Sequence, residues 1–346
     1  KEDYKKTKLG WIPKGWKIAQ LKDVAILNPK TKELPEKFIY IDLESVKGGN
    51  LLSENEMNLS DAPSRAQRLL EPDDILFQTV RPYQKNNLFF KKDGDYVASS
   101  GYAQLRAKKS SGFLYQLIFA KYLNNQVMAR CTGTSFPAIS AKDLSKVSIK
   151  LPPLSEQQKI AQILSTWDKA IALQEQLIAE KQALKKGLMQ LLLTGKKRFA
   201  GFEGEWEVVK LEDVCDVKGK YGIGAAAVEF SNELPRYLRI TDIDNEGNYS
   251  PEKEVSVSDK NSNEYVLGEG DIVFARTGNT TGKTYLYQQK DGVLVYAGFL
   301  IKFRPNQKYL SPEFLKFYTQ TAHYWYWVQT MSVRSGQPGI NSKEYG

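Results

Sequence analysis

Apolar residues recur at helical spacing through the middle of the chain and predict one long helix there. We expect this helix to run from Ser155 to Thr194, with Ser155 and Gln158 forming a capping box at its start. Gly195 follows directly and suits a left-handed stop. Roughly 40 residues at about 1.5 Å each give a rod of about 60 Å. That length is typical of a spacer or a coiled-coil arm rather than of an ordinary core helix.

The apolar stripe on this helix is wider than a strict two-stranded seam, so we expect it to be buried against more than one neighbour, or against one neighbour plus the ends of the flanking domains. Gln174 and Lys181 interrupt it, and polar seam residues weaken packing but fix register. Gly187 predicts a kink or a close approach. The predicted docking and coiled-coil residues are Ile160, Ile163, Leu164, Trp167, Ile171, Gln174, Leu177, Ile178, Lys181, Leu184, Leu188 and Leu191.

The chain repeats itself on either side of the helix. The phrase GWKIAQLKDV at 15–24 reappears as EWEVVKLEDV at 205–214, and DDILF at 73–77 reappears as GDIVF at 270–274. FPAISAKD at 136–143 matches QPGINSKE at 337–344 in the same order. Two copies of one domain therefore flank the rod. We predict domains at 1–151 and 198–346, with the spacer helix at 152–197 between them.

Each copy mixes strand-like runs with helical windows. Residues 38–43, 74–77 and 293–296 are short, apolar and bounded by turn residues, whereas 112–130 and 311–330 are helical in pattern. The predicted fold class is α+β, with an antiparallel or mixed sheet in each copy. The phrase that leads into the rod after the first copy does not follow the second, so we expect the distal helix to be truncated or supplied by another chain.

Composition narrows the class of partner. Lys and Arg number 49 against 40 for Asp and Glu, a formal charge of +9, which favours polyanions. The two cysteines are far apart and predict neither a disulfide framework nor a zinc site, and we expect no metal in this chain. No apolar run reaches about 18 residues, so we predict a cytoplasmic protein without a membrane partner.

Catalytic motifs are sparse. A single histidine, His323, makes a nucleophile–histidine–acid arrangement improbable. The run GNTTGKT at 278–284 resembles a phosphate-binding loop, but it has three residues between its glycines where the Walker pattern needs four. The following residues 285–287 predict a strand instead of a helix, which removes the helix dipole from the site. Nucleotide binding is therefore the weakest of the alternatives.

The same loop suits DNA recognition, because Arg pairs with guanine and Asn with adenine. The first copy places a different polar loop at the same anchor, although solvated turn polarity explains any single residue about as well. The predicted DNA-contacting residues are Gln78, Thr79, Arg81, Tyr83, Lys85 and Asn86, then Arg276, Thr277, Asn279, Thr280, Thr281 and Lys283. A second paired location near the domain ends adds Thr134, Ser135, Arg334 and Gln337.

At these residues the chain resembles the specificity subunit of type I restriction-modification systems. The carrying phrases are GWIPKGW at 10–16, LPPLSEQQKIA at 151–161, DIVFARTG at 271–278 and SGQPGI at 335–340. The resemblance covers essentially the whole chain but lacks the distal conserved helix. It implies two similar target recognition domains separated by a long coiled-coil-type helix, each domain reading one half of a split DNA target.

The resemblance also implies partners. A specificity subunit is not itself catalytic; it recruits modification subunits, which methylate adenine N6 with S-adenosylmethionine, and restriction subunits, which translocate and cleave DNA with ATP and Mg. We therefore expect no cofactor on this chain, and either a second copy or a distal helix over the apolar stripe. The alternative is a non-enzymatic two-domain protein-interaction scaffold, which would lack steeply salt-dependent binding to double-stranded DNA.

Overall fold

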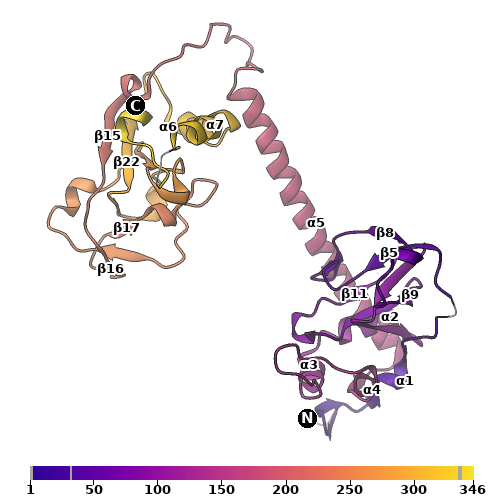
Figure 1. The fold of residues 1–346 in the computed structure, drawn as a ribbon. Coiled ribbons are helices and arrows are strands. Elements are labelled where there is room, and N and C mark those ends of the chain that lie inside the picture. Colours follow the sequence, from indigo (N-terminus) through magenta and orange to yellow (C-terminus); the bar gives the residue numbers. More distant parts are fainter. Residues whose placement is uncertain (1–2, 32, 334–336) are drawn as a thin grey trace. The chain divides into compact units, whose positions relative to one another are not determined.

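The computed structural model describes residues 3–31, 33–333 and 337–346. It divides into two compact units, unit 1 (Lys1–Gln176) and unit 2 (Leu177–Gly346). Both units combine helices with small sheets, so the α+β prediction is confirmed (Figure 1). The division falls within the long helix α5 (Leu154–Leu192), which is uninterrupted.

Unit 1 contains two four-stranded sheets. The first has the order β11-β10-β13-β4 and is antiparallel throughout, whereas the second, β8-β5-β12-β9, contains the parallel pair β5 and β12. The pairs β1–β2, β6–β7 and β3–β14 complete the unit. The strands are β1 (Tyr4–Thr7), β2 (Gly10–Pro13), β3 (Lys17–Gln20), β4 (Ala25–Leu27), β5 (Lys37–Ile41), β6 (Val46–Lys47), β7 (Asn50–Leu51), β8 (Asn55–Asn58), β9 (Ala66–Leu69), β10 (Ile75–Gln78), β11 (Leu88–Phe89), β12 (Tyr96–Ser99), β13 (Tyr102–Ala107) and β14 (Ser148–Leu151).

Unit 2 repeats this plan. Its sheet β15-β22-β19-β20 is antiparallel like the first sheet of unit 1, and β16-β18-β17-β21 again contains one parallel pair, β17 with β21. Residues 205–210, which repeat the phrase of β3, form no strand. The strands are β15 (Cys215–Tyr221), β16 (Ala227–Glu229), β17 (Arg236–Leu238), β18 (Val255–Val257), β19 (Ile272–Ala275), β20 (Thr284–Leu286), β21 (Leu294–Tyr296) and β22 (Leu300–Pro305).

Both predicted helical windows are helical, and each contains two helices in place of a continuous one. Ala120 and Thr321 have extended backbones and act as the N-caps of new helices, which a periodicity of apolar residues does not reveal. The helices of unit 1 are α1 (Leu21–Val24), α2 (Ser111–Leu117), α3 (Lys121–Met128) and α4 (Ala141–Ser145). Those of unit 2 are α6 (Pro312–Tyr318), α7 (Ala322–Met331) and α8 (Ser342–Tyr345).

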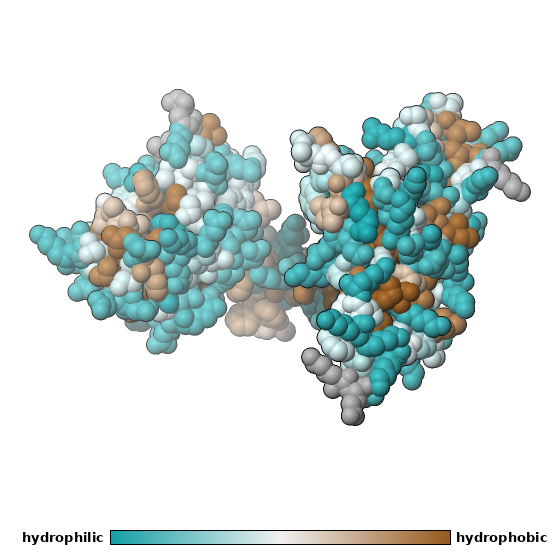
Figure 2. Space-filling view, turned by 90° about the horizontal axis from the view of Figure 1, so that it is seen from below, coloured by the Kyte–Doolittle hydropathy of each residue, from teal (hydrophilic) through white to brown (hydrophobic). Residues whose placement is uncertain are grey.

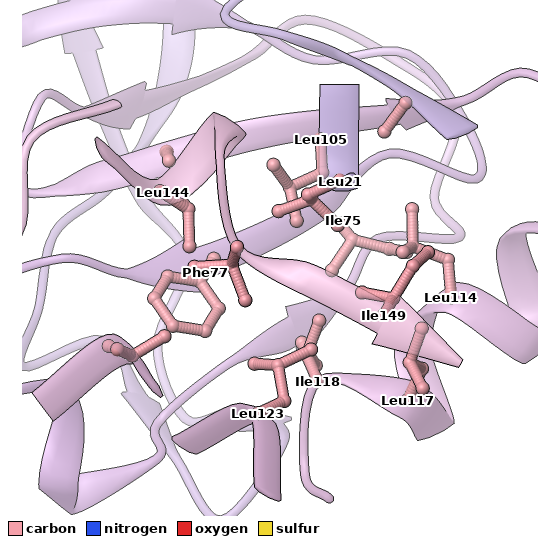
Figure 3. Close-up of a cluster of buried hydrophobic side chains, with 14 of the residues drawn as sticks. Leu21, Ile75, Phe77, Leu105, Leu114, Leu117, Ile118, Leu123, Leu144 and Ile149 are labelled. Carbon is pink, nitrogen blue, oxygen red and sulfur yellow. The ribbon is translucent and has the colours of Figure 1, made fainter. Parts of the chain in front are cut away.

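The central strand of each unit is buried on both faces. In β10, Ile75 and Phe77 join the cluster beneath the helices, whereas Leu76 joins the cluster on the opposite side, as the alternation of a strand requires. Figure 3 shows Phe77 among side chains from the helices, including Leu123 and Leu144. Packing on both faces fixes the position of the strand, and it also fixes the point at which the chain leaves the strand.

A buried carboxylate fixes the start of each central strand. Asp74 accepts hydrogen bonds from the Glu71 amide at 2.8 Å and from the Arg106 guanidinium at 2.9 and 2.8 Å. Asp271 does the same with the Gly268 amide at 2.9 Å and with Arg304 at 2.7 and 2.9 Å. These bonds raise the pKa of both guanidinium groups above the ordinary value.

The third hydrogen-bond donor to this carboxylate differs between the units. Asp74 accepts a further bond from the Gln104 amide at 2.7 Å, whereas Asp271 accepts one from the Lys302 ammonium at 3.2 Å. Lys302 is buried with the carboxylate, and its side chain is only 9% exposed. Unit 2 therefore holds one more buried charge than unit 1 at this position.

Helix α5 begins one residue earlier than predicted. The Pro153 carbonyl accepts the first bonds, from the amides of Glu156 and Gln157 at 3.0 Å each, so the predicted capping box of Ser155 was wrong. Gly195 does lie in the left-handed region, with φ +69°. The helix passes through Gly187 without a break.

Most of the apolar stripe on α5 is uncovered. Only its start packs on the core of unit 1, through Ile160 and Ala161, helped by a bond from the Trp16 indole to Glu156 at 3.0 Å. The exposed apolar seam residues are Ile163, Leu164, Trp167, Ile171, Leu177, Ile178, Leu184, Leu188 and Leu191, and the polar Gln174 and Lys181 are exposed as well. Burial of this stripe by a partner stays a prediction.

The remaining surface is that of packed globular units. Hydrophilic residues cover most of the face seen in Figure 2, with apolar residues in small groups between them. Within the described ranges, every helix is too short or too polar to cross a membrane.

Candidate nucleic-acid interface

Two polar loops leave the central strands at equivalent points. The first loop (residues 79–87) follows β10, and the second loop (residues 276–283) follows β19. The amide of Arg81 donates to the Pro137 carbonyl at 2.8 Å, and the amide of Gly278 donates to the Pro338 carbonyl at 3.0 Å. These matching bonds make Arg81 and Gly278 equivalent positions of the two copies.

The same bonds bring the two predicted locations together in each unit. We name residues 132–138 the first closing segment and residues 337–339 the second closing segment. Val80 forms a β-bridge with Ala138, and Thr277 forms one with Gly339. Thr134 and Ser135 are exposed on the first closing segment, and Gln337 is exposed on the second. Arg334 lies outside the described residues.

The first loop is held by amide side chains. The buried Gln78 accepts from the Asn86 amide at 3.0 Å and donates to the Gln84 side chain at 2.8 Å. Asn87 accepts from the backbone amide of Gln78 at 2.9 Å, and Thr79 donates to the Gly101 carbonyl at 2.6 Å. Gln78 and Thr79 therefore position the loop, since the side chain of Gln78 bonds to two loop residues and that of Thr79 ties the start of the loop to Gly101.

The outer residues of the first loop stand in an unusual backbone conformation. Arg81 and Lys85 have φ of +54° and +57°, the left-handed region that side chains other than glycine seldom occupy. They flank a short 3₁₀ turn, Pro82–Gln84, on which Tyr83 is exposed. Asn86 accepts from the Gly48 amide at 3.3 Å.

An open hollow of about 650 Å³ lies beside this loop. Its wall combines the loop with the β6–β7 hairpin and one exposed aromatic residue. The lining residues are Leu43, Glu44, Val46, Lys47, Leu52, Gln78, Val80, Arg81, Gln84, Asn86 and Phe136. The lining combines two cationic residues, Lys47 and Arg81, with amide side chains, apolar side chains and one acidic residue, Glu44. Its wall therefore includes cations and amide donors that can contact a phosphate or a base edge.

The second loop is held from outside by phenol groups. The Tyr345 hydroxyl accepts from the Gly282 amide at 3.1 Å and donates to the Ala275 carbonyl at 2.8 Å. The Tyr324 hydroxyl donates to the Gly282 carbonyl at 2.8 Å. Burial raises the pKa of both phenols above the ordinary value, which is itself well above neutral pH.

Several predicted contact residues of the second loop are occupied within the fold. Thr281 is buried and donates to the Gly278 carbonyl at 2.8 Å, and the Thr280 hydroxyl donates to the Thr277 carbonyl at 3.3 Å. The Lys283 ammonium donates to the Ile243 carbonyl at 3.1 Å. Strand β20 follows the loop, as predicted, and the loop itself contains only a short 3₁₀ turn, Gly278–Thr280. An α-helix therefore does not begin at this loop, and the phosphate-binding alternative lacks the helix dipole on which it depends.

Two residues of the second loop remain available at the surface. Asn279 is exposed. Arg276 is half-buried, and its guanidinium lies 4.9 Å from the centre of the Tyr221 ring. In unit 1, the Arg81 guanidinium lies 4.3 Å from the centre of the Phe136 ring. Each loop thus offers an arginine stacked on an aromatic side chain, which restricts the guanidinium plane. Among the residues that the structure describes, neither guanidinium donates a side-chain hydrogen bond.

Sequence reasoning missed the residues that support these groups. Phe136 and Tyr221 were not predicted as site residues, because a contact between an arginine and a ring far along the chain leaves no local pattern. Tyr345 was missed because its contacts with the second loop are also made far along the chain. Phe136 did carry one usable signal, since it precedes Pro137 where the other copy has Gln337.

The family of the chain follows from comparison with known proteins. The family model of the type I restriction modification DNA specificity domain matches residues 13–181 and 203–344, and the chain therefore belongs to that family. The type I restriction enzyme MjaVIII specificity subunit of Methanocaldococcus jannaschii is 30% identical over 211 residues, which are 54% of this chain and 46% of that protein. The MjaIX specificity subunit of the same organism is 23% identical over 273 residues, 69% of this chain and 60% of that protein. The chain thus spans about half the length of these relatives.

Solved structures agree with the fold. A chain from a study of the complex assembly and conformational transition of a type I restriction-modification system has a TM-score of 0.55 and 25% identity, covering 96% of this chain and 85% of that chain. The type I S subunit from M. genitalium has a TM-score of 0.61 at 15% identity, covering 96% and 83%, which supports the fold alone. The predicted arrangement of two similar units joined by a long helix is therefore confirmed.

Proposed function

We propose that this chain is the specificity subunit of a type I restriction-modification complex, in which each unit reads one half of a bipartite DNA target. The observation that carries the proposal is the pair of loops at one anchor. Both follow the buried central strand and both bond to a closing segment, yet their outer residues differ. A shared scaffold with unlike loops is what two different half-sites require.

Helix α5 has two roles in this proposal. It sets the length of the unread spacer between the half-sites, and its exposed stripe docks the methyltransferase (modification) subunits. The exposure of so many large apolar side chains on one helix supports a partner there, because isolated chains seldom leave such a stripe open. A second copy or a distal helix is a further occupant of the stripe.

The chain itself is non-catalytic in this proposal. S-adenosylmethionine, ATP and Mg belong to the modification and restriction subunits, and this chain contributes only the choice of sequence. A formal charge of +9 supports contact with double-stranded DNA, and a cytoplasmic location follows from that partner. The alternative of a protein-interaction scaffold is not favoured, because the DNA specificity family model matches both units.

The proposal is tested by exchanging residues 1–150 for the corresponding domain of a related specificity subunit. The methylated sequence of the resulting complex, read by single-molecule sequencing, should change in one half and keep the other half. The basis is that each half-site contributes its own base contacts, worth about 1–3 kcal/mol each.

An exchange of residues 198–346 is the matched control and should change only the other half. If either exchange alters both halves together, the two units do not read DNA independently. A complex of the unaltered chain that binds duplex DNA without any sequence preference would contradict the proposal as a whole.

A further inference from the structure

One equivalent position of the two loops carries different residues under the same backbone constraint. Arg81 and Gly278 make the same bond to a proline carbonyl of the closing segment, and both have positive φ, +54° and +71°. Glycine is the residue that takes this conformation without strain. Unit 2 therefore shows that the fold is satisfied by glycine here, whereas unit 1 keeps an arginine at a position that disfavours it.

The arginine comes with a partner that is exchanged in the same way. The Arg81 guanidinium lies 4.3 Å from the centre of the Phe136 ring. Phe136 immediately precedes Pro137, and in unit 2 the residue before Pro338 is Gln337. An ideal β-carbon on Gly278 would lie 3.1 Å from the Gln337 side chain, so the two positions are neighbours in both units. Unit 1 thus has arginine and phenylalanine at the two positions where unit 2 has glycine and glutamine.

The geometry leaves the recognition edge of Arg81 open. Phe136 is 59% exposed and covers one face of the guanidinium, which keeps the plane fixed. Across the ranges that the structure describes, the side chain of Arg81 donates no hydrogen bond to another residue and forms no ion pair. Arg81 lines the hollow of about 650 Å³ together with Lys47, Asn86 and the acidic residue Glu44.

Unit 2 presents its arginine from another position. Arg276 precedes Gly278 by two residues and is equivalent to Thr79, since its carbonyl accepts from the Ile340 amide as the Thr79 carbonyl accepts from the Ile139 amide. Its guanidinium lies over Tyr221 of β15 instead of over the closing segment. The two units therefore offer the same chemical group at different places relative to a common strand end.

We infer that Arg81, held by Phe136, is the residue with which unit 1 reads a guanine in its half-site, by donating to guanine O6 and N7. This inference rests on the proposed function. A planar fork of fixed orientation matches the two acceptors on the major-groove edge of guanine. A phosphate contact needs only a flexible charge, which Lys85 in the same loop already supplies.

The experiment uses the complex of the full chain with its modification subunits, containing the wild-type chain, Arg81→Gly or Lys85→Gly. Lys85 is the matched control, because it is the other non-glycine residue of this loop with positive φ, at +57°. Each substitution removes one positive charge and relieves the same kind of strain. Binding is measured on duplexes carrying every base at each target position and at several salt concentrations, alongside thermal unfolding.

Arg81→Gly should lower the preference for guanine at one position of the unit 1 half-site by about 5- to 150-fold, the equivalent of losing one bidentate base contact. The half-site of unit 2 should be unchanged, and the unfolding midpoint should not fall below that of the wild type. Lys85→Gly should weaken all sequences alike and reduce the salt slope by about one. A second variant, Arg81→Lys, keeps the charge but not the fork, and should lose the guanine preference while retaining the salt slope.

Three results would overturn the inference: an unchanged preference at every position in both Arg81 variants, a uniform loss like that of Lys85→Gly, or a unit 1 half-site without guanine. Each leaves the wild-type preference intact, so the proposed function survives them. Absence of any preference in the wild-type complex is a different result, which overturns the proposed function and the inference together.

Discussion

The two loops satisfy their backbones by different means. In unit 1 the bonds come from within, through Gln78 and Asn87. In unit 2 they come from two helices, through Tyr324 of α7 and Tyr345 of α8. Buried backbone groups must be paired in either case, so each loop needs one such set.

Three of the residues that hold one loop have an apolar counterpart in the other unit. Ala275 ends β19 where Gln78 ends β10, and it has no polar side chain to offer. Leu123 is the third residue after the N-cap of α3, as Tyr324 is after the N-cap of α7, and Leu144 corresponds in the same way to Tyr345. Both leucines are fully buried in the core of unit 1. A loop can therefore change its sequence only together with the residues that hold it, which explains why two copies of one fold can diverge so far around a constant anchor.

The largest difference in stability between the two units is expected when their buried carboxylates are removed. Asp271→Ala should destabilise unit 2 by about 3–5 kcal/mol, because it leaves the buried ammonium of Lys302 without its counter-charge. Asp74→Ala should cost unit 1 only about 2–3 kcal/mol, since Gln104 is neutral and the Arg106 side chain is 29% exposed. Hydrogen exchange of β19 and β10 in increasing urea measures each unit separately. Equal losses in the two units would remove the distinction.

A smaller loss is expected when the outer support of the second loop is removed. Tyr345→Phe deletes the hydroxyl that serves the Gly282 amide and the Ala275 carbonyl, and should destabilise this loop by about 1–3 kcal/mol. Faster hydrogen exchange of the Gly282 amide should report the loss. Tyr326→Phe on the exposed face of α7 is the control and should change nothing. If both variants exchange alike, the phenol of Tyr345 does not hold the loop.

The smallest effect is expected from removing the inner support of the first loop. Gln78→Ala installs the residue type that unit 2 carries and should cost about 1–2 kcal/mol, because the Asn86 amide loses its acceptor. Within the proposed function, discrimination at the unit 1 half-site should weaken while that at the unit 2 half-site stays constant. Gln84→Ala removes only the single bond between the two side chains and should have less effect. A stronger effect from Gln84→Ala would show that Gln78 is not the organising residue.

The repeat and the long helix were predictable because the repeated phrases and the apolar periodicity each extend over many residues. The central strands were predictable too, since β10 and β19 are short apolar runs that follow an acidic turn. The helix breaks at Ala120 and Thr321 were not, because a single extended residue does not disturb the apolar periodicity on either side.

The candidate site was predictable only to the level of the loop. Polar residues after a buried strand indicated where to look, and the structure does bring each loop beside its closing segment. The sequence did not show which side chains form hydrogen bonds within the protein and are therefore not free to contact DNA. The Lys283 ammonium bonds to the carbonyl of Ile243, which the sequence does not place near it, and the stacks of Arg81 and Arg276 join residues far apart along the chain.

The pairing of β3 with β14 has a consequence for how the protein can evolve. Lys17 and Leu151 are partners in this two-stranded sheet, so the segment between them begins and ends at one place, immediately before α5 begins. A segment with adjacent ends can be replaced as a block without disturbing the helix after it. Recombination between genes at these two points would install a complete new first unit on the same helix. The pairing thereby allows such a protein to exchange a whole module in one step, so that a loop and the residues that hold it are replaced together. Stepwise substitution would instead pass through chains in which a loop lacks some of the hydrogen bonds that hold it.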